Sequence, residues 1–370
     1  MIEGFATLAG TERYAGRHSK ALEAGHFRTY SDFMLSSVGL GTYLGDPDED
    51  TDTRSYEAAR LCLTSGVNVI DSAINYRAQR SERVIGRLLK DLIAKNLIRR
   101  DEVFISTKGG FIPFDSDYPK DSYRHIAEYY IQPGIISERE LIQGCHAMTS
   151  KYLENQLELS FKNLDVQTID LYYLHNPEIQ LEALSEEDFY SALRKAFEFL
   201  EGKVTQGKIK MYGTATWNGY RVPKETQGYL SLAKILETAV QAGGEGHHLK
   251  AVQLPYNLGM PEALANQNQS WKGESVSAIE FARRAGLLVF TSASLLQGRL
   301  AQRLPDKIRS LFPNCSTHAA CALQFVRSTP GITTALVGMK LLDHVAENLA
   351  VSEVSPLSKE QFFELFIPHS

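Results

Sequence analysis

Short apolar runs recur along the chain, and segments with helical spacing separate them. Eight runs have the length of a strand, at 36–42, 67–73, 103–109, 169–175, 210–216, 251–257, 287–293 and 334–339. The runs are continuously apolar rather than alternating, which is typical of a parallel sheet buried on both faces. Between them, 56–66 and 277–286 have helical spacing and end near glycine, a frequent residue after a helix.

Eight strands alternating with helices predict an α/β fold, a closed (β/α)8 barrel of the TIM type; an open doubly wound sheet is the alternative. We expect one domain: residues 1–35 as an N-terminal cover that includes a hairpin, 36–350 as the barrel and 351–370 as a C-terminal tail. Two segments are too long for a minimal barrel. They are 111–144 after the third strand and 218–250 after the fifth, and both predict extended loops.

Polar side chains interrupt the apolar pattern where several predicted strands end. Asp71 ends the second run and Tyr76 follows five residues later, while Lys108 and His175 lie at the ends of the third and fourth runs. Because the C-terminal ends of barrel strands meet on one face, where active sites are built, these four residues are expected to converge. Gln253, in the sixth run, is expected on the same face.

A helix is predicted to begin just after Tyr76. Ser81 can cap its first turn, and Glu82 favours the positive end of the helix dipole. The sequence therefore predicts a strand, a polar loop and a helix in close succession.

The four strand-end residues suit proton transfer to a carbonyl oxygen. An unperturbed Tyr has a pKa of about 10, a neighbouring Lys ammonium lowers that pKa, and an Asp keeps the Lys charged. A His can hydrogen-bond the carbonyl or relay a proton, and general acid catalysis of this kind contributes about 10²–10⁴-fold. Each residue alone also has an ordinary explanation, as an ion pair, a core histidine or a packing tyrosine. Four together at matching strand ends favour a site.

Several stretches resemble the aldo-keto reductase family. They are GVNVIDSAINY, SERVIG, STKGG and IDLYYLHNP, within a resemblance that runs from about residue 39 to 349. By this resemblance, Asp71, Tyr76, Lys108 and His175 correspond to the family's catalytic tetrad. It implies a (β/α)8 barrel that works as an NADP-dependent oxidoreductase on a small carbonyl or alcohol substrate, with Tyr76 as general acid and base.

The resemblance also implies which residues hold the cofactor, NADP(H). They are Gly41, Thr42, Asp71, Gln253, Ser292, Lys340, Glu347 and Asn348. Lys340 lies where a basic residue often meets the 2′-phosphate, which favours NADP over NAD, although a solvated charge before a helix is its alternative role. The chain departs from the family at Ala215 and Thr216, where many members have Ser-Asn, and at Ser292, where many have a stacking Tyr.

Three other interpretations fit parts of the sequence. GLGTYLG at 39–45 looks like a dinucleotide-binding loop, but Leu44 stands where the third glycine belongs. Tyr220 and Lys224 have the spacing of a Tyr-x-x-x-Lys pair, but Pro223 would disrupt the helix. A regulatory subunit of the same fold, which binds cofactor with little turnover, stays open.

The charge of the chain makes some kinds of binding partner less expected than others. The formal net charge is -5 and no long basic run occurs, which disfavours nucleic acid and anionic membranes. No signal-like N-terminus or stretch of roughly 18 apolar residues is present, so a cytoplasmic protein is expected. The cysteines are scattered, which predicts reduced thiols and no metal site; they are Cys62, Cys145, Cys315 and Cys321.

Aromatic residues crowd the first part of the long segment after the third strand. They are Phe111, Phe114, Tyr118, Tyr123, Tyr129 and Tyr130. They could line an apolar pocket or pack the segment onto the barrel, and the second interpretation is favoured.

Overall fold

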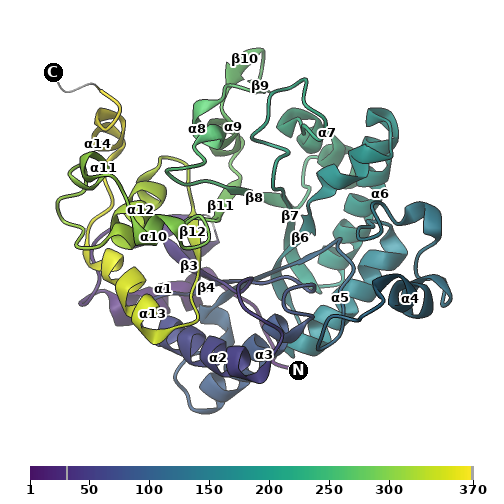
Figure 1. The fold of residues 1–370 in the computed structure, drawn as a ribbon, viewed down its shortest axis with the longest axis horizontal. Coiled ribbons are helices and arrows are strands. Elements are labelled where there is room, and N and C mark those ends of the chain that lie inside the picture. The colour runs from purple at the N-terminus through teal and green to yellow at the C-terminus, as the bar shows by residue number, and fades with distance from the viewer. Residues whose placement is uncertain (31, 368–370) are drawn as a thin grey trace.

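The computed structural model describes residues 1–30 and 32–367, whose strands form a closed barrel surrounded by helices (Figure 1). The barrel strands are all parallel, in the order β11-β12-β3-β4-β5-β6-β7-β8. Their bounds are β3 Val38–Gly41, β4 Val69–Asp71, β5 Phe104–Gly109, β6 Ile169–His175, β7 Ile209–Ala215, β8 Leu249–Pro255, β11 Leu288–Ser292 and β12 Thr334–Gly338. The predicted (β/α)8 barrel is confirmed, and the pairing of β12 with β3 closes it.

Each of the eight apolar runs matches one barrel strand to within two residues at either end, and both faces of the strands are covered. Val69, Phe104 and Leu171 belong to an apolar cluster inside the barrel. Their chain neighbours Ile70 and Ile105 belong to the larger cluster beneath the helices. The continuous apolar runs arise because successive side chains of a strand point to opposite, equally buried faces.

Helices cover the outside of the barrel. The longer ones are α1 Leu8–His18, α2 Glu49–Thr64, α3 Arg80–Ala94, α5 Ser150–Leu164, α6 Glu186–Thr205, α7 Leu232–Gly243, α9 Ala278–Arg284, α12 His318–Ser328 and α13 Leu342–Leu349. The shorter ones are α4 Ser122–Ile126, α8 Glu262–Ala265, α10 Arg299–Gln302, α11 Asp306–Arg309 and α14 Lys359–Glu364. Helix α2 begins before the predicted residue 56 because Asp48 caps it, accepting a hydrogen bond from the Thr51 backbone N at 2.7 Å.

The start of α3 differs from the prediction. Its N-cap is Gln79, which makes no side-chain cap, and Ser81 instead donates to the Thr42 carbonyl at 2.8 Å. Glu82 is buried and accepts a hydrogen bond from Thr107 Oγ1 at 2.6 Å. The predicted capping role of Ser81 is therefore wrong, and both side chains instead fasten the helix to neighbouring strands.

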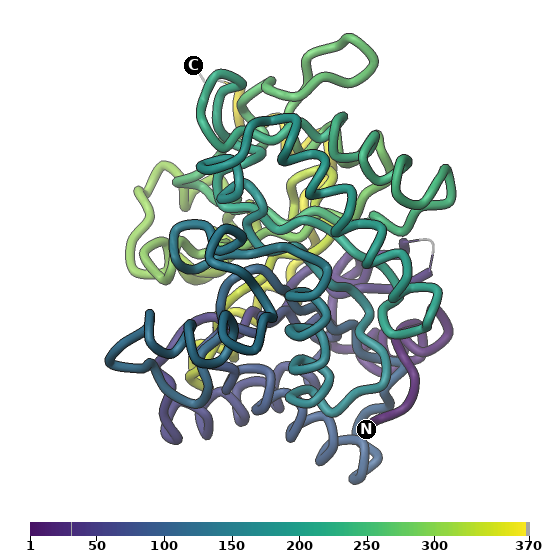
Figure 2. The backbone as a smooth tube through the Cα atoms, turned by 90° about the vertical axis from the view of Figure 1, so that its right-hand side faces the viewer, coloured from purple at the N-terminus to yellow at the C-terminus, as the bar shows by residue number. Residues whose placement is uncertain are grey.

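The N-terminal segment packs against the end of the barrel where the strands begin. Strands β1 (Phe27–Tyr30) and β2 (Phe33–Ser36) form the expected hairpin. Phe33 contacts Phe104, the first residue of β5, with ring centroids 5.1 Å apart. Figure 2 shows the purple N-terminal residues on one side of the barrel and the blue segment 111–144 toward the other. The strand C-termini are thus left open to build a site.

The two long segments have different structures. Segment 111–144 contains α4, a π-helical turn Ala127–Ile131 and a 3-10 turn, and it has a small core of its own. In segment 218–250, α7 and the start of β8 (Leu249–Pro255) occupy the second half, so only the part before Leu232 is an extended loop. A short hairpin of β9 (Gln269–Trp271) and β10 (Glu274–Val276) lies between α8 and α9.

Within residues 1–30 and 32–367, no helix is both long and apolar enough to cross a bilayer. No group of three or more His, Cys, Asp or Glu in the same ranges could hold a metal ion. The four cysteines are free thiols, of which Cys145 is the one that is not buried.

Candidate active site

The barrel brings the four predicted catalytic residues together at the C-terminal ends of its strands. Asp71 is the last residue of β4, His175 the last of β6, and Lys108 lies one residue before the end of β5. Tyr76, in the loop after β4, places its hydroxyl 3.3 Å from Lys108 Nζ. The Tyr76 and His175 rings meet edge to face with centroids 5.8 Å apart.

Lys108 and Asp71 form a buried ion pair beneath the tyrosine. Lys108 Nζ lies 2.5 Å from Asp71 Oδ2 and also donates to the Ser72 carbonyl at 2.7 Å. The other Asp71 oxygen accepts hydrogen bonds from Ser106 Oγ at 2.7 Å and Gln253 Nε2 at 2.9 Å. Every polar atom of the pair has a partner, which is the condition under which two charges can be kept out of water.

Burial shifts the pKa values of Tyr76 and Lys108 so that the neutral form of each is favoured. Burial raises the pKa of Tyr76 well above its usual value, and the negative charge of Asp71 adds to this. Burial also lowers the pKa of Lys108, against the pull of Asp71. Lys108 therefore does not bring the pKa of Tyr76 below its usual value, because desolvation of the phenolate outweighs an ammonium that is shared with Asp71. Tyr76 is therefore a neutral phenol at rest.

His175 is held as a neutral ring. Burial lowers its pKa well below the usual value, and Lys108 and His146 act in the same direction. The His175 carbonyl accepts a hydrogen bond from His146 Nε2 at 2.7 Å. Because Gln180 Nε2 donates to His146 Nδ1 at 2.8 Å, the ring proton of His146 lies on Nε2. Gly110 permits this contact, because a Cβ there would lie 2.7 Å from His146 Nε2 and its φ is +144°.

These shifts predict a flat pH profile through neutrality. A lowered pKa keeps His175 uncharged above that pKa, and a raised pKa keeps Tyr76 protonated below its own. We expect kcat/KM for carbonyl reduction to stay constant from about pH 6 to pH 8 and to fall only in alkaline solution, where the phenol is lost. An inflection near the usual His pKa that disappears in His175→Asn would contradict this assignment.

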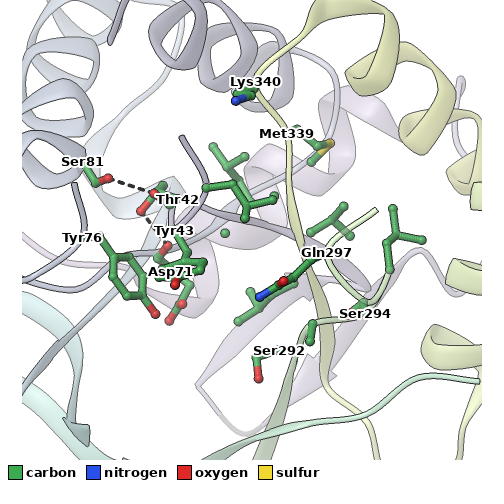
Figure 3. Close-up of a pocket in the computed structure, with 18 of the residues that line it drawn as sticks. Thr42, Tyr43, Asp71, Tyr76, Ser81, Ser292, Ser294, Gln297, Met339 and Lys340 are labelled. Carbon is green, nitrogen blue, oxygen red and sulfur yellow. Dashed lines mark hydrogen bonds between the residues drawn. The ribbon is translucent and has the colours of Figure 1, made fainter. Parts of the chain in front are cut away.

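A cavity of about 830 Å³ opens above these residues and runs along the ends of the strands. Figure 3 shows Asp71 and Tyr76 side by side, with Lys340 across the cavity from them. All of the residues predicted to hold a cofactor line it, namely Gly41, Thr42, Asp71, Gln253, Ser292, Lys340, Glu347 and Asn348. Residues from β3, β4, β8, β11 and the α13 region thus share one elongated wall.

The polar atoms of this wall fit an elongated polar ligand such as a nicotinamide dinucleotide. Thr216 Oγ1 and Asn348 Oδ1 are buried in the wall and have no hydrogen-bond partner among the described residues. Thr216 therefore offers a hydroxyl where Ala215 cannot contribute through its side chain. An orphaned buried oxygen costs stability unless a bound group or water meets it, so both atoms favour a ligand here.

A second cavity of about 670 Å³ adjoins the first and shares part of its wall. Tyr43, Leu44, Asn75 and Phe111 line both. The second cavity extends under segment 111–144, where Phe114 and other apolar groups line it.

The aromatic residues of segment 111–144 were expected either to line a pocket or to pack the segment onto the barrel, and the structure shows some of each. Phe111, Phe114 and Tyr118 line cavities, whereas Tyr130 packs in the segment's own core. Tyr123 and Tyr129 are exposed.

Sequence reasoning missed several residues that shape the site. Tyr43 lies edge to face with Tyr76 at 5.1 Å, and Trp217 lines the cavity. Glu178 is buried and accepts hydrogen bonds from the backbone N of Trp217 at 2.7 Å and of Asn218 at 3.1 Å, which fixes that loop. Tyr43 and Trp217 each lie two residues after the end of a strand, and this position could have identified them as site residues. The positions of Glu178 and His146 in the sequence give no such indication.

Comparison with known proteins identifies the family. The model of the Aldo/keto reductase family matches residues 37–235, more than half of the chain, so the chain belongs to that family. The matched region includes β3 to β7 and all four clustered residues.

Individual relatives are distant. Aldo-keto reductase family 1 member C13 of Mus musculus is 25% identical over 161 residues, which cover 44% of this chain and 36% of the mouse protein. A probable voltage-gated potassium channel subunit beta of Oryza sativa subsp. japonica is 22% identical over 348 residues, which cover 88% of this chain and 90% of the rice protein. The chain spans about a third of the length of the first curated relatives that it matches.

Solved structures share the fold. An aldo/keto reductase from Klebsiella pneumoniae, crystallised with NADP and acetate, superposes with a TM-score of 0.60 at 20% identity and covers 92% of this chain and 94% of its own. At this identity the likeness establishes the barrel.

Proposed function

We propose that this protein is a nicotinamide-dependent reductase of small aldehydes or ketones. The observation that carries the proposal is the contact of Lys108 Nζ with both Asp71 Oδ2, at 2.5 Å, and the Tyr76 hydroxyl, at 3.3 Å, at the floor of an elongated cavity. Burying an ammonium beside a phenol adds little to the stability of a fold. Groups whose pKa values are shifted by burial in this way are common at functional sites.

The cavity wall supports a cofactor at this site. Lys340, Glu347 and Asn348 would hold the adenosine end, and Gln253 and Thr216 the end near Tyr76. A bound nicotinamide would supply a hydride, with its electron pair, to the carbonyl carbon of the substrate. Family membership and the NADP-bound relative from Klebsiella pneumoniae support this assignment.

The protein's own residues would supply the proton that the carbonyl oxygen needs. Tyr76 gives its hydroxyl proton to the carbonyl oxygen, which becomes the alcohol oxygen, and the resulting phenolate later regains a proton from water. Lys108 stabilises that phenolate, and Asp71 keeps the ammonium charged although burial lowers its pKa. The neutral His175 ring, in edge contact with Tyr76, helps to orient the carbonyl.

The second cavity supports a neutral substrate, because aromatic and uncharged polar side chains form most of its wall. Its wall includes Tyr43, Phe111, Phe114 and Ile126. Arg77 is the one charged residue among the described residues of this wall, and its charge is compensated by Asp52. An anionic substrate would find no free cation there, so keto acids and sugar phosphates are disfavoured.

A second candidate function is a cofactor-binding regulatory subunit with little turnover. The match to a probable potassium channel subunit beta over 88% of this chain favours it. A steady-state assay with NADPH and a panel of neutral and anionic aldehydes and ketones separates the two. The reductase proposal expects turnover with neutral members of the panel, whereas the subunit expects cofactor binding without turnover.

The preference for NADPH should depend on Lys340. Lys340→Ala is expected to weaken NADPH binding at least about tenfold and leave NADH binding nearly unchanged, because a charge-assisted phosphate contact is lost. Fluorescence titration of both cofactors against both proteins measures this. Equal affinities of the wild type for the two cofactors, or an unchanged preference in the variant, would refute the role of Lys340.

A further inference from the structure

The backbone immediately after Tyr76 has an unusual conformation. Arg77, Ala78 and Gln79 have φ values of 50°, 51° and 70°, so three consecutive non-glycine residues lie in the left-handed region. L-residues other than glycine disfavour this region, and a run of them persists only where surrounding contacts hold it. The contacts around this loop therefore determine where the Tyr76 phenol lies.

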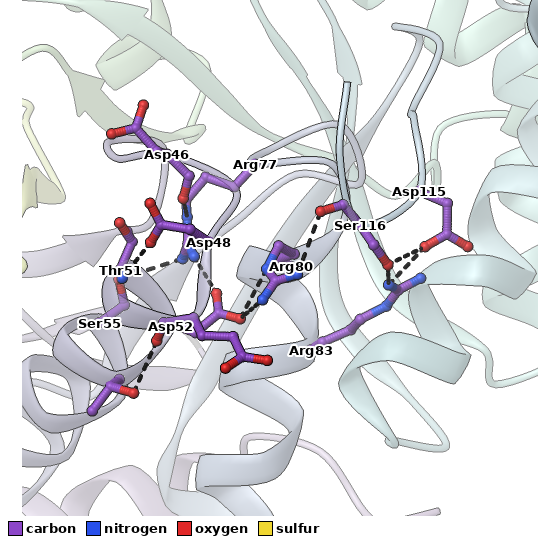
Figure 4. Close-up of polar contacts among 12 residues, drawn as sticks. Asp46, Asp48, Thr51, Asp52, Ser55, Arg77, Arg80, Arg83, Asp115 and Ser116 are labelled. Carbon is purple, nitrogen blue, oxygen red and sulfur yellow. Dashed lines mark hydrogen bonds and ion pairs between the residues drawn. The ribbon is translucent and has the colours of Figure 1, made fainter. Parts of the chain in front are cut away.

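The side chain of Arg77 is one of these contacts and is almost wholly buried, with 2% of the residue exposed. Its Nε donates to the Asp46 carbonyl at 3.0 Å, and its guanidinium forms an ion pair with Asp52 in the first turn of α2 (Figure 4). The second Asp52 oxygen accepts a hydrogen bond from Arg80 Nε at 2.9 Å. The Asp52 carboxylate thus binds both Arg77, in the loop after Tyr76, and Arg80, the first residue of α3.

The next two residues are held from another direction. The Ala78 carbonyl accepts a hydrogen bond from the Ser116 backbone N at 2.9 Å. Gln79 Nε2 donates to the Phe114 carbonyl at 2.9 Å. Segment 111–144 therefore fixes Ala78 and Gln79, and Arg77 is the residue of the three that faces α2.

Arg77 also holds the cavity mouth. Asp46 belongs to residues 42–48, between β3 and α2, which we call the mouth loop. This loop carries Tyr43 and Leu44, which line both cavities, and the Tyr43 ring meets Tyr76 at 5.1 Å. The Arg77 guanidinium, which extends from the Tyr76 loop, thus bonds both to the mouth loop and to the start of α2.

We propose that Arg77 is a positioning residue that holds Tyr76 and the mouth loop in one rigid unit. Its ion pair with Asp52 and its bond to the Asp46 carbonyl keep the phenol within reach of Lys108 and keep Tyr43 against the phenol. The catalytic part of this inference rests on the proposed reductase function, and the structural part does not.

Arg77→Gly tests the catalytic part, because glycine suits the left-handed backbone and removes only the side chain. Single-turnover reduction should fall about tenfold or more in this variant, and the same change in a Tyr76→Phe background should cost less than about twofold, since Arg77 acts through the phenol. Arg284→Met is the control. The Arg284 guanidinium bonds to Glu280 of α9 at 2.6 Å and to Glu274 of β10 at 2.5 Å, and it has no contact with the Tyr76 loop or the mouth loop, so the rate of this variant should stay within about twofold of the wild type.

Hydrogen exchange tests the structural part without cofactor or turnover. Amide exchange in residues 42–48 and 72–80 should rise at least about tenfold in Arg77→Gly and in Asp52→Asn, and should stay unchanged in Arg284→Met. Unchanged exchange in Arg77→Gly, or a wild-type reduction rate, would overturn the inference while the reductase proposal stands. Raised exchange in a protein that reduces no carbonyl would support the positioning role and refute the reductase.

Discussion

Tyr76→Phe is expected to slow carbonyl reduction by about 10²–10⁴-fold, the range typical of losing a general acid. The substitution removes one hydroxyl and keeps the ring, so the edge contacts with Tyr43 and His175 survive. Cofactor binding should be unchanged, because the cavity wall keeps its shape. The effect belongs to the chemical step and is measured as the single-turnover oxidation of bound NADPH, with fluorescence titration to confirm binding.

Tyr43→Phe is the matched control for this prediction. It removes a hydroxyl from a tyrosine of the same cavity, whose ring lies 5.1 Å from Tyr76, and it should leave the single-turnover rate within about twofold of the wild type. If Tyr76→Phe binds NADPH and reduces substrate at nearly the wild-type rate, another group gives the proton. If both variants lose activity equally, the cavity has been disturbed and Tyr76 has no special role.

Lys108→Met should damage both stability and rate. Lys108 is fully buried, and its removal leaves the Asp71 carboxylate in the core without its counter-charge. Breaking a buried pair in this way costs about 3–5 kcal/mol of unfolding free energy. The reduction rate should fall by about 10²–10³-fold, as when one stabilising donor is taken from a developing oxyanion, because the phenolate loses the ammonium. Urea unfolding and single-turnover kinetics measure the two effects.

Two further variants separate stability from chemistry. Asp71→Asn combined with Lys108→Met removes both charges, so part of the lost stability should return while the rate stays low. Lys203→Met breaks a pair with Glu154 on the outside of the barrel, with an N–O distance of 2.5 Å, and should leave the rate unchanged. Recovery of the rate in the double variant would show that Lys108 serves the fold alone.

Much of the fold follows from the sequence because its signal is repeated eight times. Each barrel strand is short and buried on both faces, so it appears as a separate apolar run, and parallel strands then place their ends on one side. The bounds of helices are less readable. Helix α2 begins at Glu49 because Asp48 caps it, and polar first-turn residues resemble a loop until the cap is known.

The cluster of Asp71, Lys108 and His175 was predictable because strand register alone brings strand ends together. The conformation of the Tyr76 loop could not be predicted in this way. Left-handed backbone is usually signalled by glycine in the sequence, but here Arg77 and Gln79 adopt it. The raised pKa of Tyr76 was also missed, because residue spacing gives the presence of Lys108 but not the degree of burial.

The central claim is that the protein is a working reductase, and a single-turnover experiment tests it most directly. The wild type, loaded with NADPH that carries deuterium at the transferred position, is mixed with excess neutral aldehyde, and both cofactor oxidation and the product are followed. We predict that bound cofactor is oxidised and that the alcohol carries one deuterium on the former carbonyl carbon. Cofactor that binds but stays reduced with every carbonyl offered would contradict it and favour the cofactor-binding subunit.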